Sequence, residues 1–191
     1  MEIETHPFDP WLPANARLLM LGTFPPAPHR WCMPWYYPNF QNDMWRIFGI
    51  CFFGDKLHFV DEAHKTYRLE ALKAFLKEKG VAIFDTALRI RRTKNNASDK
   101  DLDIVEPADL DGMLRRLPQC RAVLAAGQLA TKVFTDHYGI KAKGLKMGGY
   151  VEFGFEGRTL RLYRLPSSSR AYPMAVEKKA EYYHRMFEDI L

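Results

Sequence analysis

The chain is poor in cysteine and has no long hydrophobic run. Its 191 residues include only three cysteines, Cys32, Cys51 and Cys120, and none belongs to a C-x-x-C pair. An odd number of isolated thiols argues against a disulfide framework and a four-thiolate cluster, so we expect reduced, buried thiols. No window approaches the roughly 18 apolar residues of a transmembrane helix, and no cationic segment followed by an apolar one opens the chain. These absences predict a cytoplasmic protein, nucleoid-associated in a bacterium, with no membrane partner.

Signals for bound cofactors and metals are also missing. Gly144, Gly148 and Gly149 do not form a G-x-G-x-x-G motif after a strand, which argues against a dinucleotide cofactor. His58 and His64 do not have the spacing of a zinc motif, and a solvated helix face explains them better. No internal repeat or low-complexity linker interrupts the chain. We therefore expect neither metal nor cofactor, and one domain spanning residues 1–191.

The composition is that of a globular enzyme-sized domain. Hydrophobic residues make up 47% of the chain and charged residues 27%, which is enough apolar material for an independent core. The net charge is +5 and the pI about 9.1. A mildly basic chain is compatible with a polyanionic partner, although many proteins without such a partner share this balance.

Hydrophobic patterning predicts alternating strands and helices. Apolar runs predict strands at 18–21, 81–84 and 122–126 and a hairpin with arms at 150–155 and 159–165. Helices are predicted at 39–49, 67–79, 107–117, 128–138 and 174–191. Asn39 is a candidate N-cap, Pro107 lies near a first turn, and Gly80 and Gly139 fit left-handed caps. The polar segment 89–103 is predicted to be a surface loop. With the hairpin's second arm as the fourth core strand, the pattern predicts a three-layer α/β/α sandwich with a central four-stranded, mainly parallel sheet.

Unusual residues follow three of the predicted strands. They are the segments 22–26 (GTFPP), 85–87 (DTA) and 165–170 (LPSSSR). Ligands of open α/β sheets bind outside the carboxyl ends of the strands, so these segments are expected to open on one edge. The first strand also leads into a loop rich in proline and aromatic residues, whose flat faces can stack on a planar ligand. The sequence therefore predicts a pocket for a ring.

Four motifs together resemble those of a known family. They are GTFPP (22–26), YYPNFQNDMW (36–45), VAIFDTA (81–87) and LPSSS (165–169). In this order, over nearly the whole chain, they resemble the uracil-DNA glycosylase superfamily, and most closely its hypoxanthine-DNA glycosylase branch. The resemblance implies a monofunctional, cofactor-free DNA repair glycosylase that flips a deaminated base (hypoxanthine, uracil or xanthine) and hydrolyses its N-glycosidic bond. It also implies DNA containing a damaged base as the partner, and we expect a monomer.

Two positions depart from the best-known branches. Phe24 stands where those branches carry an Asp or Asn that positions the attacking water, and Leu165 stands where the uracil enzymes have His. Phe24 cannot orient water, and Leu165 cannot stabilise a departing base. In the hypoxanthine branch the resemblance places the polar role on Asn42, whose amide can hold a water by hydrogen bonding. We therefore expect a slow enzyme, or one acting on bases that leave readily.

The remaining roles follow from residue chemistry and from the resemblance. Asp85 is predicted to accept a hydrogen bond from a ring N–H of the base and to repel a neighbouring carbonyl oxygen. Tyr37 or Phe40 is predicted to stack on the base. The predicted base-binding residues are Gly22, Thr23, Phe24, Pro25, Tyr37 and Phe40, and the predicted DNA-binding residues are Ser167, Ser168, Ser169, Arg170, Arg91 and Arg92. Asn42 and Asp85 are the predicted catalytic residues.

Each candidate also has a purely structural interpretation. Asn42 and Asn39 can cap a helix, Asp85 can cap the turn after its strand, and the serines can form a turn of their own. Phe24 and the aromatic residues around Trp35 can close the end of the core. A catalytically silent nucleic-acid-binding module and an enzyme of free nucleosides are therefore alternative functions at this stage.

Overall fold

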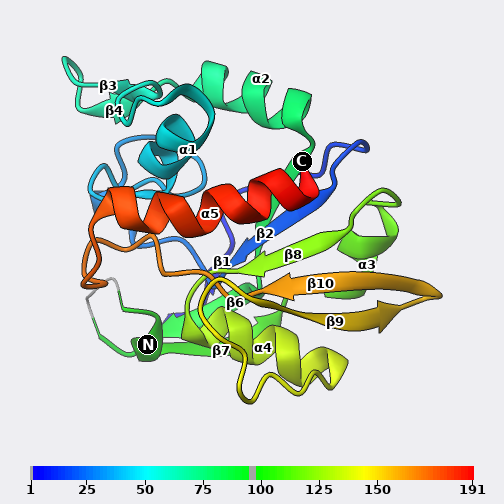
Figure 1. Ribbon diagram of the computed structural model, residues 1–191. Helices are drawn as coiled ribbons and strands as arrows, with labels where there is room; N and C mark the ends of the chain where they lie inside the picture. The colour runs from blue at the N-terminus through cyan, green and yellow to red at the C-terminus, as the bar shows by residue number, and fades with distance from the viewer. Residues whose placement is uncertain (1, 95–97) are drawn as a thin grey trace.

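The computed structural model describes residues 2–94 and 98–191 and has a five-stranded sheet at its centre (Figure 1). The strands, in spatial order, are β5 (Val81–Asp85), β2 (Leu18–Gly22), β8 (Ala122–Ala125), β10 (Arg158–Tyr163) and β9 (Tyr150–Phe155). The first four are parallel, and β9 pairs antiparallel with β10. The mainly parallel sheet is confirmed, but it has five strands instead of four. Both arms of the predicted hairpin join it, because β9 pairs along the whole of β10 as an edge strand.

Helices cover both faces of this sheet (Figure 1). On one side lie α1 (Met44–Phe53), α2 (Leu69–Lys79) and α5 (Val176–Ile190), and on the other α3 (Leu110–Arg115) and α4 (Gln128–Tyr138). Every residue of β2, β5 and β8 is buried, which explains their continuous apolar sequences. The predicted three-layer α/β/α sandwich is confirmed.

The ends of the helices differ from prediction where side chains bind the backbone. Helix α1 begins at Met44 instead of residue 39, and Asn39 does not cap it. Asn39 instead accepts a hydrogen bond from the Gln41 amide, and the carbonyl of Phe40 accepts one from Arg46. These side-chain contacts hold the segment before α1 in a non-helical path.

Two glycine caps are confirmed, and one proline was misplaced. Gly80 and Gly139 end α2 and α4 with φ of 76° and 63°. Helix α3 begins three residues beyond Pro107. Its N-cap is Asp109, whose side chain accepts a hydrogen bond from the Gly112 amide. Pro107 instead ends a strand.

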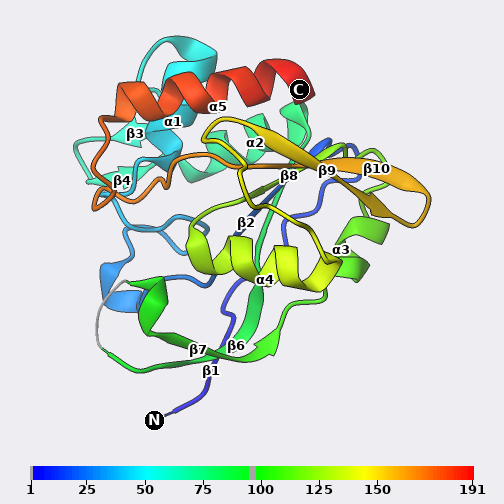
Figure 2. The same cartoon turned by 60° about the horizontal axis from the view of Figure 1, so that its bottom comes forward.

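A second, antiparallel sheet lies below the central one (Figure 2). It contains β1 (Glu4–Thr5), β6 (Ala87–Arg92) and β7 (Leu102–Pro107). The predicted surface loop over 89–103 is therefore wrong at 89–92 and 102–103, which are strand residues, whereas 93, 94 and 98–101 lie in the connection between β6 and β7, and 95–97 lie outside the described residues. The many charged residues of this segment are typical of a loop, but here they pair across two strands. Arg89 lies 3.5 Å from Glu106, and Arg91 lies 3.7 Å from Asp103.

Short elements complete the chain. A small hairpin joins β3 (Val60–Asp61) and β4 (Thr66–Tyr67), and 3-10 turns lie at Pro28–Arg30 and Asp99–Asp101. Within the described ranges, no helix is both long and apolar enough to cross a bilayer.

Candidate functional site

A pocket of about 290 Å³ opens at the carboxyl edge of the central sheet. The loops after β2, β8 and β10, the last residue of β5, the segment before α1 and the residues around η2 (Asp99–Asp101) surround it. The lining includes Gly22, Thr23, Phe24, Pro25, Tyr36, Tyr37, Asn42, Asp85, Arg92, Asp99, Gly127, Ser167, Ser168, Ser169 and Arg170. The structure thus brings together all three strand-end segments that the sequence singled out.

The floor of the pocket is formed where Gly22 faces Asp85 in the β2–β5 register. A Cβ atom at Gly22 would lie 2.5 Å from Oδ1 of Asp85, so only glycine leaves room for this carboxylate. The other carboxylate oxygen, Oδ2, lies 2.7 Å from Nε2 of His6, whose side chain is fully buried. One oxygen of Asp85 is therefore bound by a residue 79 positions away in the sequence.

Tyr37 lines the same floor in a strained backbone conformation. Its φ is 50°, which is uncommon for a residue other than glycine. Its ring meets Trp45 edge to face, with the centroids 5.7 Å apart. Its buried hydroxyl has no hydrogen-bond partner among the described residues, and burial raises the pKa of Tyr37 well above its usual range. The hydroxyl therefore keeps its proton at the pocket floor.

A second carboxyl group, that of Asp99, lines the pocket. The Thr23 hydroxyl donates to its Oδ2 at 2.9 Å. Burial raises the pKa of Asp99 above its ordinary value of 3.8, and the nearby charge of Asp85 acts in the same direction. Two acidic side chains therefore contribute negative potential to one small pocket.

Phe24 serves the core as well as the pocket. It is 9% exposed and packs with Ala87 and Ile90 between the two sheets. Its ring lies 5.2 Å from that of His6, and the guanidinium of Arg92 lies 5.7 Å from its centroid. The Phe24 ring therefore packs against the His6 ring and limits its movement.

Asn42 binds the start of α1 and also lies at the pocket. Its Oδ1 accepts a hydrogen bond from the Met44 amide at 2.9 Å and so satisfies the first amide of the helix, although the N-cap position itself is Asp43. It also lines the pocket. An amide oxygen has two lone pairs and its nitrogen two hydrogens, so capping leaves capacity to hold a water.

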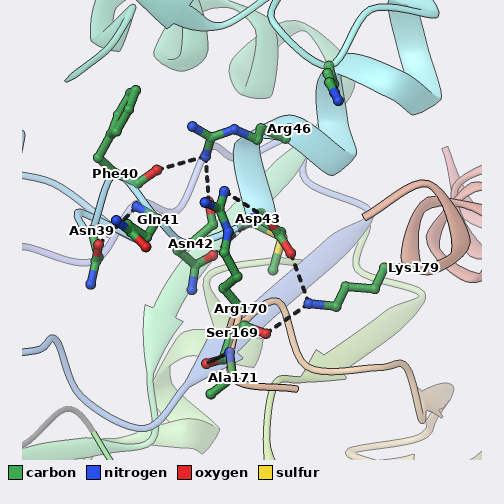
Figure 3. A network of polar contacts seen from close by, with 12 residues as sticks. Asn39, Phe40, Gln41, Asn42, Asp43, Arg46, Ser169, Arg170, Ala171 and Lys179 are labelled. Carbon is green, nitrogen blue, oxygen red and sulfur yellow. Dashed lines mark hydrogen bonds and ion pairs between the residues drawn. The ribbon is translucent and has the colours of Figure 1, made fainter. Parts of the chain in front are cut away.

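The serine segment is connected to α1 and α5 by a buried ion pair (Figure 3). The Asp43 amide donates to the Ser168 carbonyl at 2.9 Å. The Lys179 ammonium donates to Oδ2 of Asp43 at 2.9 Å and to the Ser169 carbonyl at 2.8 Å. Arg170, with a half-exposed side chain, reaches Oδ1 of Asp43 at 3.4 Å.

Within the segment, the serines bond to their own turn. Oγ of Ser167 accepts from the Ser169 amide, and Oγ of Ser169 accepts from the Ala171 amide. This matches the turn interpretation of the motif. The Ser169 and Arg170 side chains nevertheless remain at the exposed rim of the pocket.

The positions of three predicted residues favour a contact with the base or with DNA less than the sequence suggested. Phe40 is not among the residues that line the pocket, and its ring instead packs 4.9 Å from the Arg46 guanidinium. Arg91 also lies outside the lining and pairs with Asp103. Arg92 lines the pocket but pairs with Glu4 at 2.9 Å and donates to the Pro25 carbonyl.

Sequence reasoning missed four site residues, His6, Asp43, Asp99 and Lys179. One of them carried a usable signal, because Lys179 lies on the apolar face of α5 together with Val176 and Ala180. His6 and Asp99 carried none, since both act through tertiary contacts with distant segments. Over residues 2–94 and 98–191, no group of three or more His, Cys, Asp or Glu side chains is arranged to hold a metal ion.

Comparison with known proteins supports the fold. No protein-family model matches the chain, and a comparison with curated proteins finds no match either. Among solved structures, the chain is similar to the solution NMR structure of a "putative Uracil DNA glycosylase" from Methanosarcina acetivorans. The TM-score is 0.61 at 21% identity, and the match covers 98% of this chain and 99% of that one. At this level of identity the likeness shows the fold, and the chain has the α/β/α fold of that protein over almost its whole length.

Proposed function

We propose that this protein is a DNA glycosylase of the uracil-DNA glycosylase superfamily, in its hypoxanthine branch, and that it removes a deaminated base. One observation carries the proposal. The four segments that resemble family motifs, together with the residue equivalent to the branch's polar Asn, surround one pocket of about 290 Å³ at the carboxyl edge of the sheet. The shared fold with the Methanosarcina acetivorans protein supports the same interpretation.

In this proposal the target nucleotide leaves the duplex, at a cost of a few kcal/mol, and its base enters the pocket. Asp85 accepts a ring N–H of the base, and Tyr37 contributes a flat wall. Asn42 holds the attacking water. Cleavage places positive charge on the sugar and negative charge on the base. The negative potential of the pocket favours the charge on the sugar and opposes the charge on the base, which is consistent with the slow enzyme expected from Phe24 and Leu165.

The rim of the pocket contacts the DNA backbone. The Ser167–Ser169 turn is small enough for close approach of phosphates, and the Arg170 guanidinium lies next to it. We also propose that the protein acts as a monomer and as one domain, in the compartment that holds the chromosome.

A panel of duplexes tests the function. Each duplex carries one uracil, hypoxanthine or xanthine, and alkali cleaves the abasic sites after incubation with the protein. Strand breaks at hypoxanthine or another deaminated base are expected. Tight binding without breaks at any base would identify a silent binding module, an outcome that Phe24 and Leu165 at the usual polar positions would explain. Hydrolysis of free inosine without action on duplexes would identify a nucleoside enzyme.

A further inference from the structure

We propose that His6 is the positioning residue for Asp85 and that this pair makes the pocket select bases with a ring N–H. The inference rests on the proposed function, since it concerns the substrate class of the same pocket. His6 belongs to none of the four motifs. It enters the site because β1 pairs with β6 and the His6 amide donates to the Leu88 carbonyl at 2.8 Å.

The hydrogen bonds of the imidazole define which nitrogen carries its proton. The Asp85 carboxylate only accepts hydrogen bonds and so calls for a proton on Nε2, and the Phe8 amide, 3.1 Å from Nδ1, can then donate to the lone pair of that nitrogen. The proton of the neutral ring then resides on Nε2 and points at Oδ2 of Asp85, 2.7 Å away. A doubly protonated ring keeps this bond and donates from Nδ1 to the Phe8 carbonyl at 3.0 Å. His6 is therefore a donor to Asp85 in both states.

Aromatic side chains prevent the ring from turning away. The centroid of the His6 ring lies 4.5 Å from that of Phe84, 5.2 Å from Phe24 and 5.9 Å from Phe8. The side chain has no solvent-exposed area, so water cannot replace it as a partner of Asp85. A fixed donor on Oδ2 therefore fixes the plane of the carboxylate.

This arrangement leaves Oδ1 of Asp85 at the Gly22 floor as a hydrogen-bond acceptor. Hypoxanthine, xanthine and uracil carry a proton on the ring nitrogen beside a carbonyl, and it can be donated to such an oxygen. Adenine and cytosine carry a lone pair at the equivalent nitrogen, which a carboxylate repels. Sites built to bond a polar hydrogen discriminate by about 10⁴-fold or more against analogues that lack it. The His6–Asp85 pair thus supplies a chemical reason to act on hypoxanthine and uracil and not on adenine and cytosine, whereas guanine, the parent of xanthine, carries the same ring N–H and is not rejected by this contact.

The test compares two substitutions at His6. His6→Phe fills the same aromatic surroundings without a donor, and His6→Gln restores an N–H that can reach Asp85. In single-turnover excision from a hypoxanthine duplex, His6→Phe is expected to lose about 10- to 100-fold in rate with unchanged DNA affinity, and His6→Gln to recover most of it. His64→Phe is the matched control, because it also replaces a histidine that contacts an aspartate. His64 is exposed, its Nδ1 lies 2.8 Å from Oδ2 of Asp61, and neither residue lines the pocket.

Two further measurements separate positioning from packing. In an Asp85→Ala background, His6→Phe should cause no additional loss, because no side chain remains for His6 to position. Full additivity of the two substitutions, or parental rates for His6→Phe, would overturn the proposal. ¹⁵N NMR of labelled histidine reads the His6 tautomer without any activity, and a proton on Nδ1 alone would also overturn it. If no base is excised but the Nε2–H tautomer is present and its signals change in Asp85→Ala, the glycosylase function fails while the positioning contact stands.

Discussion

The Lys179 ammonium donates to Oδ2 of Asp43 across 2.9 Å, and both side chains are buried. This pair joins the last helix to the residue that follows Asn42. The same ammonium also binds the Ser169 carbonyl, so one cation holds two walls of the pocket.

Lys179→Met is expected to destabilise the fold by about 3 kcal/mol, because the buried Asp43 carboxylate keeps only the half-exposed Arg170, at 3.4 Å, as a charged partner. Urea unfolding monitored by circular dichroism measures this. Lys178→Met is the control, since Lys178 is exposed and pairs with Glu181 on the helix surface. Its effect should stay within about 0.5 kcal/mol. Equal stability of the two variants would show that the buried pair contributes little.

Substitutions at Asn42 separate its capping role from its chemical role. Asn42→Ala removes both, so it should lose about 1 kcal/mol of stability and about 100-fold or more in excision rate, with DNA affinity nearly unchanged. Asn42→Asp keeps the oxygen that accepts from the Met44 amide and should keep the stability while losing excision. Parental excision by Asn42→Ala would remove this residue from the mechanism.

Asp85→Asn is expected to change which base is preferred. The asparagine oxygen can accept from His6, and its amide group then presents a donor where the carboxylate presents an acceptor. Relative excision rates across the uracil, hypoxanthine and xanthine duplexes, with adenine and cytosine duplexes added, measure the shift. An unaltered ranking would mean that Asp85 supports the pocket floor without reading the base.

Arg170→Ala distinguishes a phosphate contact from a side chain that fills the vacated base stack. A phosphate contact predicts weaker binding on all sequences and a salt dependence reduced by about one counterion. A filling role predicts an unchanged salt slope and a greater loss of excision from duplex than from single strands. Arg116→Ala, an exposed arginine before β8 at the opposite edge, is the control. If neither quantity changes in Arg170→Ala, this rim does not face DNA.

Asp99→Asn is expected to raise thermal stability at neutral pH. Burial raises the folded-state pKa of Asp99 above 3.8, so the stability that the group contributes is fully present below pH 3.8 and is lost as the pH rises through the folded value. Asparagine avoids that loss and can still accept from Thr23. Melting curves from pH 3.5 to 7 should show a gain that is near zero in acid and reaches a plateau above the folded-state pKa. Asp103→Asn, on the exposed part of β7, is the control, and a gain independent of pH would contradict the expectation.

The sequence predicts the parts of the fold in which local pattern and burial agree. The strands β2, β5 and β8 are buried on both faces, so their apolar runs are continuous, and Gly80 and Gly139 mark helix ends by a backbone conformation that glycine favours. The sheet β6–β7 is the opposite case. Its strands bury few side chains and pair charge with charge, so its sequence resembles that of a loop.

The site shows the same division. Short sequence motifs contain Gly22, Asn42 and the serines. Because these motifs lie at or near the carboxyl ends of neighbouring strands, the fold brings them to one edge of the sheet. His6 contacts Asp85 from 79 residues away, and Lys179 contacts Asp43 from 136 residues away. No local pattern encodes such partners, because they depend on how a second sheet and the last helix dock against the first.

The long-range contacts of His6 and Lys179 also bear on when the pocket forms during folding. During synthesis His6 leaves the ribosome long before Lys179, yet both support the same pocket. Contacts between such distant residues require the closure of long loops and therefore form late in folding. A nascent chain that has not yet docked α5 has Asp43 and the serine turn without their shared cation. Such a chain is expected to have no finished pocket, so an incomplete translation product does not compete with the mature protein for its ligand.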